Sequence, residues 1–481
     1  MFLSWKNWGY SKHQKGIFKI EELKKSNHKI MLYILILILL ISVPLSLLWY
    51  NYYSFKKEQK PFVEDYLSKS NNKLPSFEEK SLDGNVFTED DYSMPFMDIK
   101  IFNPYNDERI ALFVTGGSGQ KNKAYLYKDR EFKDIAKELS LEGLDEAAYS
   151  MVALDIDNDG IKEVVIGYGS AVYMQKFNNE REQYEKAIKI ADVPDAAIAH
   201  DIAFADTDNS GFQDLFVSTF VDKKHFTSAV YHDKTNKRAN LFLINNGDGT
   251  FTNKAEEAGL GIVENTYLSQ FVDINNNGKQ DLVLAMNTNT GYIYENLGNG
   301  TFKPHKLPID NGFWMGLSVE KITDKTDKYH ILMSNVGKSF PSFLLRGDLK
   351  KEEKFDAEYA LLEQIDGFTF KNVTKEKNLY SNVFGWGLQF VDLNNNGRKD
   401  AVLTENYIKF PVGFHKKYPS KGKVFMQDVN GKFAMLQDEL KLLNPHFGYR
   451  VINYDLTGNG FQDVIIGNVD GPVKIFYNNG I

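Results

Sequence analysis

The chain repeats one pattern of apolar and polar positions five times. Each copy begins with an alternating apolar run, passes through a polar loop with a central Asp-Gly, Ser-Gly or Asn-Gly, and returns to a second apolar run. Alternating and β-branched apolar runs of this length predict β-strands on either side of the loop. The copies are "LDIDNDGIKEVVIG" from Leu154, "ADTDNSGFQDLFVS" from Ala205, "VDINNNGKQDLVLA" from Val272, "VDLNNNGRKDAVLT" from Val391 and "YDLTGNGFQDVIIG" from Tyr454.

The spacing of the copies predicts two further units without the polar loop. The interval between Asp273 and Asp392 is close to twice the others, and Val319–Gly337 near its middle keeps a strand pattern, "HILMSN". One period before the first copy, Ile99–Gly117 also keeps a strand pattern. The chain therefore contains seven units of about 60 residues, the self-similarity of a propeller or solenoid.

Each unit also carries hairpin signals, and these predict the fold class. Alternating runs end in Asn-Gly or Asp-Gly turns, as in "NLFLINNGDGTF" from Asn240 and "YIYENLGNGTF" from Tyr292. Three or four strands per unit with no helical period predict an all-β, seven-bladed β-propeller over residues 96–481. The last unit stops at "FYNNGI", before its outer strand, so we expect chain N-terminal to the first blade to supply a closing strand.

The first 95 residues predict a membrane anchor. Ile30–Tyr50 runs 21 residues without a charge, long enough to cross a bilayer as a helix and longer than the apolar part of a signal peptide. Residues 1–29 hold seven lysines against two glutamates, which predicts a cytoplasmic N-terminus. We expect a single-pass protein with a signal-anchor helix at residues 30–50, a polar spacer at residues 51–95, and a periplasmic or extracellular propeller.

Overall composition excludes several classes of function. The net charge is -7, which argues against a nucleic-acid partner, because phosphate binding needs a basic face. The chain has no Cys, so disulfides, zinc ribbons and cysteine nucleophiles are excluded.

The five loops share the pattern D-x-[DNT]-x-[DNS]-G-x-x-[DE], which suits a hard cation. Oxygen side chains recur at loop positions 1, 3, 5 and 9, Gly at position 6 permits a sharp turn, and the position 7 carbonyl adds a ligand. This chemistry favours Ca²⁺, because Mg²⁺ prefers tight octahedral sites and softer metals prefer His or Cys. The alternative is a set of metal-free Asx turns. The predicted ligands of up to five Ca²⁺ sites are Asp155, Asp157, Asp159, Ile161, Glu163, Asp206, Asp208, Ser210, Phe212, Asp214, Asp273, Asn275, Asn277, Lys279, Asp281, Asp392, Asn394, Asn396, Arg398, Asp400, Asp455, Thr457, Asn459, Phe461 and Asp463.

The number of carboxylates differs between the loops. The loop at Asp155 has four, the loop at Asp206 has three, and the loops at Asp273, Asp392 and Asp455 have two each. Because ligand charge raises calcium affinity, we expect affinity to fall in that order, with the weaker sites in the range of extracellular modules.

The loops and their flanking strands resemble the FG-GAP or VCBS-type repeats of integrin α subunits and many bacterial surface proteins. "NLFLINNGDGTFTNKAEEAGL" and "FGWGLQFVDLNNNGRKDAVLT" look most like the branch that includes the cartilage acidic protein family. The resemblance covers roughly residues 96–481 and implies calcium loops that hold a seven-bladed propeller together. The chain lacks the Gly-Ala-Pro element of integrins and the cysteine-bearing tail of the cartilage acidic proteins, so neither family's partner transfers.

Candidate catalytic residues are few. His200 beside Asp201 and His232 beside Asp233 are adjacent in predicted strands, and adjacent strand residues face opposite sides.

A sugar-binding face could include Trp314 and Trp386 with the neighbouring Phe313 and Phe384, although core packing is the usual place of large aromatics.

We therefore expect a non-enzymatic protein-binding or scaffolding propeller at the membrane surface, or an accessory subunit of a membrane or envelope complex. The alternative is a calcium-dependent carbohydrate-active enzyme, such as a polysaccharide lyase or glycosidase, or a glycan-binding protein; some polysaccharide lyases resemble this propeller. The blades show no cluster of Arg or Lys for a lyase cleft.

Overall fold

The computed structural model describes residues 53–69, 73–84, 94–338, 342–406 and 420–481, together with isolated positions between 31 and 50. Two compact units divide the chain, Met1–Glu58 and Gln59–Ile481. All the described strands belong to the second unit.

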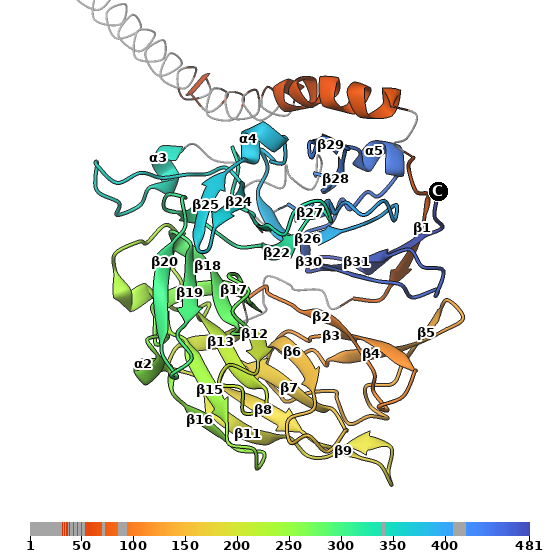
Figure 1. Cartoon of the computed structure of the whole chain (residues 1–481), viewed down its shortest axis with the longest axis vertical. Helices are drawn as coiled ribbons and strands as arrows, with labels where there is room; N and C mark the ends of the chain where they lie inside the picture. Colours follow the sequence, from red (N-terminus) through yellow and green to blue (C-terminus); the bar gives the residue numbers. More distant parts are fainter. Residues whose placement is uncertain are drawn as a thin grey trace, which may run out of the picture. The chain divides into compact units, whose positions relative to one another are not determined.

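Seven four-stranded antiparallel sheets form the blades of a propeller (Figure 1). The first three blades consist of β2 (Ile99–Phe102), β3 (Ile110–Val114), β4 (Lys123–Lys128) and β5 (Glu131–Asp134); β6 (Ala148–Leu154), β7 (Glu163–Tyr168), β8 (Ala171–Gln175) and β11 (Ile188–Asp192); and β12 (Ala197–Ala205), β13 (Asp214–Val221), β15 (Leu241–Asn245) and β16 (Phe251–Asn253).

The remaining blades have the same order of strands. They consist of β17 (Val263–Val272), β18 (Asp281–Asn289), β19 (Tyr292–Asn296) and β20 (Phe302–Lys306); β22 (Leu317–Lys321), β23 (Tyr329–Met333), β24 (Ala360–Asp366) and β25 (Thr369–Asn372); β26 (Gly385–Val391), β27 (Asp400–Glu405), β28 (Lys423–Gln427) and β29 (Phe433–Met435); and β30 (Gly448–Tyr454), β31 (Asp463–Asn468) and β32 (Val473–Asn478) with β1 (Phe77–Leu82).

Short elements decorate the blades. β14 (Arg238–Ala239) and β21 (Gly312–Phe313) extend the fourth blade, and β9 (Phe177–Asn178) and β10 (Gln183–Tyr184) form a separate hairpin. The helices that connect strands of the blades are single turns: η1 (Lys234–Asn236), α2 (Ala255–Ala258), α3 (Ser342–Leu345), α4 (Thr374–Lys377) and α5 (Gln437–Leu440).

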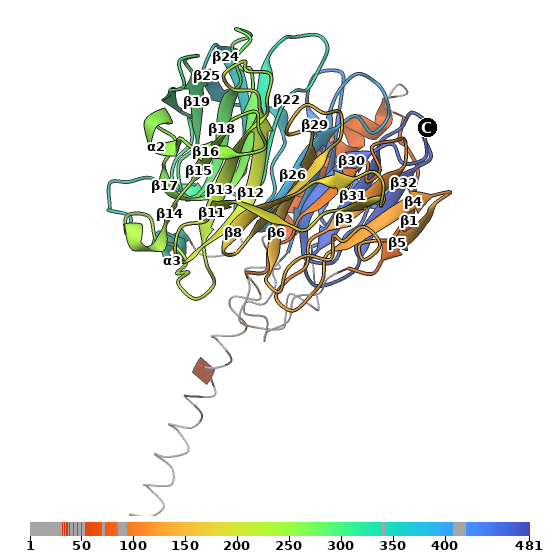
Figure 2. The same ribbon diagram turned by 90° about the horizontal axis from the view of Figure 1, so that it is seen from below.

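The predicted fold class and blade number are confirmed. Blades 1 and 5 occupy the two units that the sequence predicted to lack a loop, and the other five carry the polar loop between their first and second strands. The first strands of successive blades lie next to one another around the ring, from β2 through β6, β12, β17, β22 and β26 to β30 and back to β2 (Figure 1). Figure 2 shows the same blades turned by 90°.

β1 completes the last blade at the position where the truncated seventh unit lacks an outer strand. It pairs antiparallel with β32, from Phe77 opposite Asn478 to Leu82 opposite Val473. The first and last described strands of the chain thus share one sheet, and the otherwise open edge of β32 is covered.

Apolar side chains between neighbouring sheets form the core. One cluster joins blades 2 and 3 through residues such as Val165 and Leu215, and another joins blades 4 and 5 through residues such as Ile293 and Ile331. Since the middle of each blade is covered on both faces, its second strand is almost completely buried, as in β7 and β18, whereas outer strands such as β5 are largely exposed.

The predicted spacer at residues 51–95 is more structured than the sequence indicated. Residues 53–68 are helical, and Phe62, Val63 and Tyr66 pack against a core cluster of blades 6 and 7. These positions lie at i, i+1 and i+4, on one face of a helix, and Glu64 and Asp65 between them conceal the pattern in the sequence.

The predicted membrane span at residues 30–50 falls mostly outside the described residues. No helix among the positions that the structure describes is long and apolar enough to span a bilayer.

Candidate cation loops

All five polar loops have the same backbone turn. Position 4 is left-handed in each, with φ of 58° at Asn158, 59° at Asn209, 55° at Asn276, 52° at Asn395 and 68° at Gly458. The Gly at position 6 is left-handed too, with φ from 77° at Gly397 to 88° at Gly211. Asn and Gly tolerate this conformation better than other residues, which explains their recurrence at these two positions.

The Asp at position 1 holds the turn together. One of its carboxylate oxygens accepts the backbone N–H of position 5, and the other accepts the N–H of position 6. The distances in the five loops are 2.8–3.1 Å. Each loop therefore has a carboxylate fixed at its centre.

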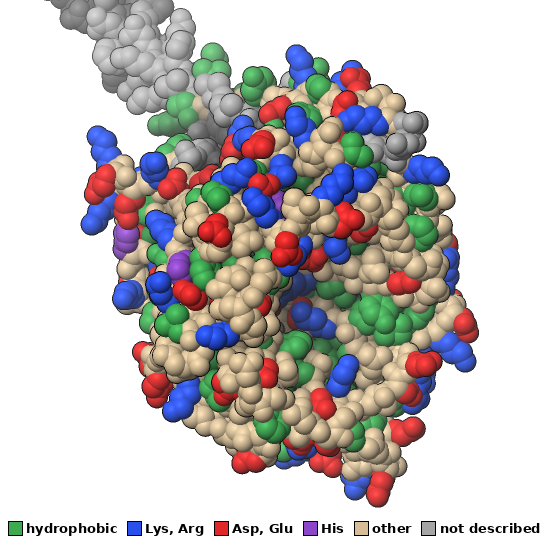
Figure 3. Space-filling model, in the orientation of Figure 1, with side chains coloured by type: hydrophobic (Ala, Val, Ile, Leu, Met, Phe, Trp, Pro, Cys, Tyr) green, Lys and Arg blue, Asp and Glu red, His purple; other side chains and the backbone are tan. Residues whose placement is uncertain are grey.

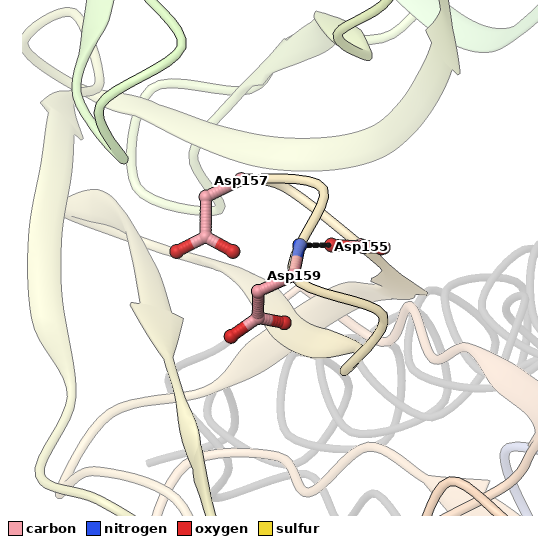
Figure 4. A group of neighbouring side chains, drawn as sticks. All are labelled: Asp155, Asp157 and Asp159. Atoms are coloured by element: carbon pink, nitrogen blue, oxygen red, sulfur yellow. Dashed lines mark hydrogen bonds between the residues drawn. The ribbon is translucent and has the colours of Figure 1, made fainter.

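The loop with the most carboxylates brings three of them together. Ligand atoms of Asp155, Asp157 and Asp159 lie within 4.8 Å of one another, and Figure 4 shows Asp157 and Asp159 extending from the same side of the turn. Glu163 is not part of this group. Lys176 Nζ lies 2.5 Å from Asp157 Oδ2, so one carboxylate is already paired with a cation of the chain.

Position 3 carries buried oxygen atoms without a hydrogen-bond partner in the described residues. These atoms are Oδ1 of Asp157, Oδ1 of Asn394 and Oγ1 of Thr457, in three of the five loops. In the other two loops, Asp208 and Asn275 accept the N–H of position 5. Buried polar atoms are rarely left unpaired, so the three oxygens indicate a missing partner, and a hard cation fits this set of donors.

Position 9 binds the backbone. One oxygen of Glu163, Asp214, Asp281, Asp400 or Asp463 accepts the N–H of position 2 at 2.8–3.1 Å. In the last four loops the other oxygen accepts the N–H of the residue that ends the third strand. The role of position 9 as a metal ligand therefore stays a prediction.

Burial shifts the protonation of these carboxyl groups. It raises the pKa of Glu163 to about 7, of Asp281 and Asp463 to about 6, and of Asp400 to about 8. Desolvation disfavours the charged carboxylate, and hydrogen bonds from the backbone N–H groups oppose that effect.

An Asn or Gln at or near the end of the third strand joins four of the five loops to the next blade. The side-chain NH₂ groups of Asn245, Asn296, Gln364 and Asn478 donate to the position 2 carbonyl of the preceding blade's loop at 2.7–2.8 Å. Gln427 follows blade 5, which has no such loop, and its Nε2 atom has no partner among the described residues. Sequence reasoning missed these residues, although their recurrence just before each hairpin turn was a signal.

The centre of the ring is filled by aromatic and charged side chains. Phe96, Tyr267, Trp386 and Tyr449 surround His200, whose Nδ1–H donates to the Tyr267 carbonyl at 2.6 Å and whose Nε2 accepts the Tyr449 hydroxyl at 2.5 Å. Burial lowers the pKa of His200 to about 3. The ring is neutral and fully occupied by internal contacts, so His200 is a core histidine.

The other candidate residues are also used internally. Trp314 is completely buried and Phe313 nearly so, while Trp386 and Phe384 pack against the central cluster. His232 lies 2.7 Å from Glu353. These side chains do not form a sugar-binding face.

A cleft of about 360 Å³ remains near the ring axis, lined by residues of β2, β6, β12 and β17. Figure 3 shows a face of the molecule that is hollowed near its centre. Phe204 is 45% exposed in this cleft, and Lys100 and Lys162 supply positive charge.

The fold and loops define a seven-bladed propeller with oxygen-rich loops, and comparison with known proteins assigns the repeat. Residues 273–320, which include the loop at Asp273, match the model of the FG-GAP-like repeat. The chain thus carries an FG-GAP-like repeat within a seven-bladed β-propeller. No curated protein is significantly similar to it in sequence.

Similar solved structures include two crystal structures of BBS1N in complex with ARL6DN. The chain in the crystal soaked with mercury shares 10% sequence identity with this chain, with a TM-score of 0.48, and the alignment covers 84% of this chain and 98% of that one. The crystal soaked with lead is also 10% identical, with a TM-score of 0.49 and coverage of 84% and 96%.

Proposed function

We propose that the protein is a membrane-anchored, extracytoplasmic propeller that binds Ca²⁺ in its polar loops and acts as a protein-binding or scaffolding module. The main support for cation binding is the set of buried oxygens without a hydrogen-bond partner at position 3 of three loops. In each of these loops the position 1 carboxylate is fixed two residues away, and both atoms belong to one short turn.

The oxygen-only donor set favours Ca²⁺. The loop at Asp155 offers three clustered carboxylates, and the Asn-rich loops at Asp273 and Asp392 offer amide oxygens and fewer charges. Calcium accepts such mixed and irregular sets of oxygen ligands, whereas Mg²⁺ retains waters and demands an octahedron. The predicted loop ligands would hold the ion, and its charge would offset the repulsion among the loop carboxylates.

A binding role is favoured over catalysis by the state of the titratable side chains. His200, His232 and the buried charges near the ring axis are engaged with other groups of the chain, and the large aromatics are packed in the core. The central cleft, with an exposed Phe204 beside two lysines, offers a surface for a protein partner.

The anchoring part of the proposal depends on the sequence. Ile30–Tyr50 is long and apolar enough to span a bilayer, and the lysines before it favour a cytoplasmic N-terminus. Tags at the two termini test this topology: external protease on intact cells is expected to remove a C-terminal tag and to leave an N-terminal tag intact. Protection of the C-terminal tag would contradict it.

Calorimetry tests the calcium sites. The melting temperature is expected to rise with Ca²⁺ concentration and to fall in chelator, because a ligand that binds only the folded state stabilises it by about 2.7 kcal/mol at a hundredfold excess over Kd. Mg²⁺ at the same concentration is the control and should have a smaller effect. Equal melting temperatures in Ca²⁺ and in chelator would contradict calcium binding.

Extraction from native membranes tests the scaffolding role. The full-length protein is solubilised in mild detergent with Ca²⁺, sized, and its companions are identified by mass spectrometry. Stoichiometric protein companions that leave on chelation are expected. A lone monomer would contradict the scaffolding role and direct attention to glycans.

A further inference from the structure

The loop at Asp392 differs from the other four because chain from the N-terminal side covers it. Asn394, at position 3, is only 5% exposed, and its Nδ2 donates to the backbone carbonyl of Lys73 at 3.1 Å. Its other polar atom, Oδ1, is buried without a partner in the described residues. The Asn394 amide therefore donates to the N-terminal chain through Nδ2, while its Oδ1 is available to bind a cation held in the loop.

Further contacts fasten the N-terminal chain to the same region of the ring. Lys69 Nζ lies 2.9 Å from Asp428, one residue beyond β28, and Tyr66 is buried in the core cluster of blades 6 and 7. Gln59 and Asn378 exchange two side-chain hydrogen bonds of 3.0 and 2.8 Å. The helical residues 59–68, Lys69 and Lys73 thus lie along blade 6, just before closing strand β1.

We propose that a cation bound in the loop at Asp392 controls the docking of residues 59–69 and 73–76 on blade 6. A cation that binds Asn394 Oδ1 fixes the amide in the orientation that directs Nδ2 to Lys73. Without the cation, the buried Oδ1 lacks the ion that fixes the amide, so the bond from Nδ2 to the Lys73 carbonyl is held less firmly. Calcium would then hold the propeller to the chain segment that leads toward the predicted anchor, a role that rests on the proposed calcium sites and goes beyond them.

Position 3 of the loop at Asp273 supplies a matched control. Asn275 is also an Asn at position 3, but its Oδ1 accepts the N–H of Asn277, and no described contact joins it to the N-terminal chain. Each of the variants N275A and N394A should weaken cation binding in its own loop to a similar extent. Only N394A should also weaken the docking of residues 59–69 and 73–76.

Hydrogen–deuterium exchange of the full-length protein in detergent, with Ca²⁺ or with chelator, tests the proposal. In the wild type, chelation is expected to speed exchange in residues 59–69 and 73–82 roughly three- to tenfold, the effect of about one hydrogen bond. N275A should retain this response. N394A should exchange fast in this region under both conditions.

The variant N394D separates the hydrogen bond from the cation. A carboxylate still binds Ca²⁺ but cannot donate to Lys73, so exchange should stay slow in residues 392–400 and become fast in residues 59–69 and 73–82. Slow exchange of the N-terminal region in N394D, an equal response in N275A and N394A, or a wild type that binds Ca²⁺ without any change there would overturn the proposal. A melting temperature insensitive to Ca²⁺ would instead overturn the calcium sites themselves.

Discussion

At the scale of single residues, amide side chains join the loops to their neighbours. Asn296 shows the arrangement completely: its Nδ2 donates to the Thr207 carbonyl of the preceding blade at 2.7 Å and to the Gln280 carbonyl at 3.3 Å, while its Oδ1 accepts the N–H of Gly298 at 2.8 Å. The side chain is 1% exposed. No aliphatic residue can replace these three bonds.

Replacing Asn296 by Ala should lower the free energy of unfolding by about 1–3 kcal/mol, because a buried carbonyl loses its donor. The control is N299A, in which an exposed side chain that bonds only within its own turn is removed, and its effect should stay within about 0.5 kcal/mol. Urea unfolding of both variants in Ca²⁺ checks this. Equal losses would show that the contact between blades adds nothing.

His200 should make the protein less stable at acidic pH. Its pKa is lowered to about 3 by burial and by the nearby Arg450, whereas in the unfolded chain it titrates near 6.5. The unfolded state therefore binds an extra proton below about pH 6.5, and the stability that the neutral ring contributes is lost as the pH falls toward 3. H200Q keeps a donor and an acceptor but does not titrate.

The measurement for His200 is unfolding free energy at several pH values between about 4 and 8. The slope for the wild type between pH 4 and 6 should exceed that of H200Q by the equivalent of about one proton. Parallel curves for the two proteins would mean that His200 does not contribute to acid unfolding.

At the scale of elements, the sequence predicted what repeats. Five loops and their ten flanking strands followed from one periodic pattern, and Ile99–Gly117 and Val319–Gly337 were located by spacing alone. The helical segment 59–68 is not part of the repeat, so the repeat pattern could not predict it. Its apolar face consists of only three residues, too few to predict a helix. The hydrogen bonds between blades were also missed, because a sequence pattern does not show which loop a distant Asn reaches.

Removal of β1 should weaken the whole propeller. A protein that begins at residue 94 lacks this strand and leaves β32 as an open edge, which favours association with another chain. Its melting temperature should fall by about 5 °C or more, and it should aggregate as concentration rises.

The control for β1 is a protein that begins at residue 73, which retains the strand but lacks the helical residues. It should stay monomeric, as judged by size-exclusion chromatography at several concentrations. If both truncated proteins behave alike, the pairing of β1 with β32 does not close the ring in solution.

At the scale of the whole molecule, buried charged side chains connect blades around the ring axis, among them blades 7 and 3, which are not neighbours. Arg450 of blade 7 lies 3.4 Å from Asp98, at the start of blade 1, and 3.1 Å from Asp201 in blade 3. Asp98 also accepts the N–H of Met151 in blade 2, and Asp201 accepts that of Ser269 in blade 4. These buried groups fix the relative positions of five blades around the axis.

Replacing Arg450 by Met should lower the free energy of unfolding by about 3–5 kcal/mol, since it removes the counter-charge of the buried Asp201 and leaves Asp98 with Lys100, 3.8 Å away. The triple variant D98N/D201N/R450M removes all three charges and keeps the side-chain volumes, so most of the loss should be recovered. A triple variant no more stable than R450M would show that Arg450 acts through packing. The aromatic cluster around His200, rather than the charges, would then stabilise the arrangement of the blades around the axis.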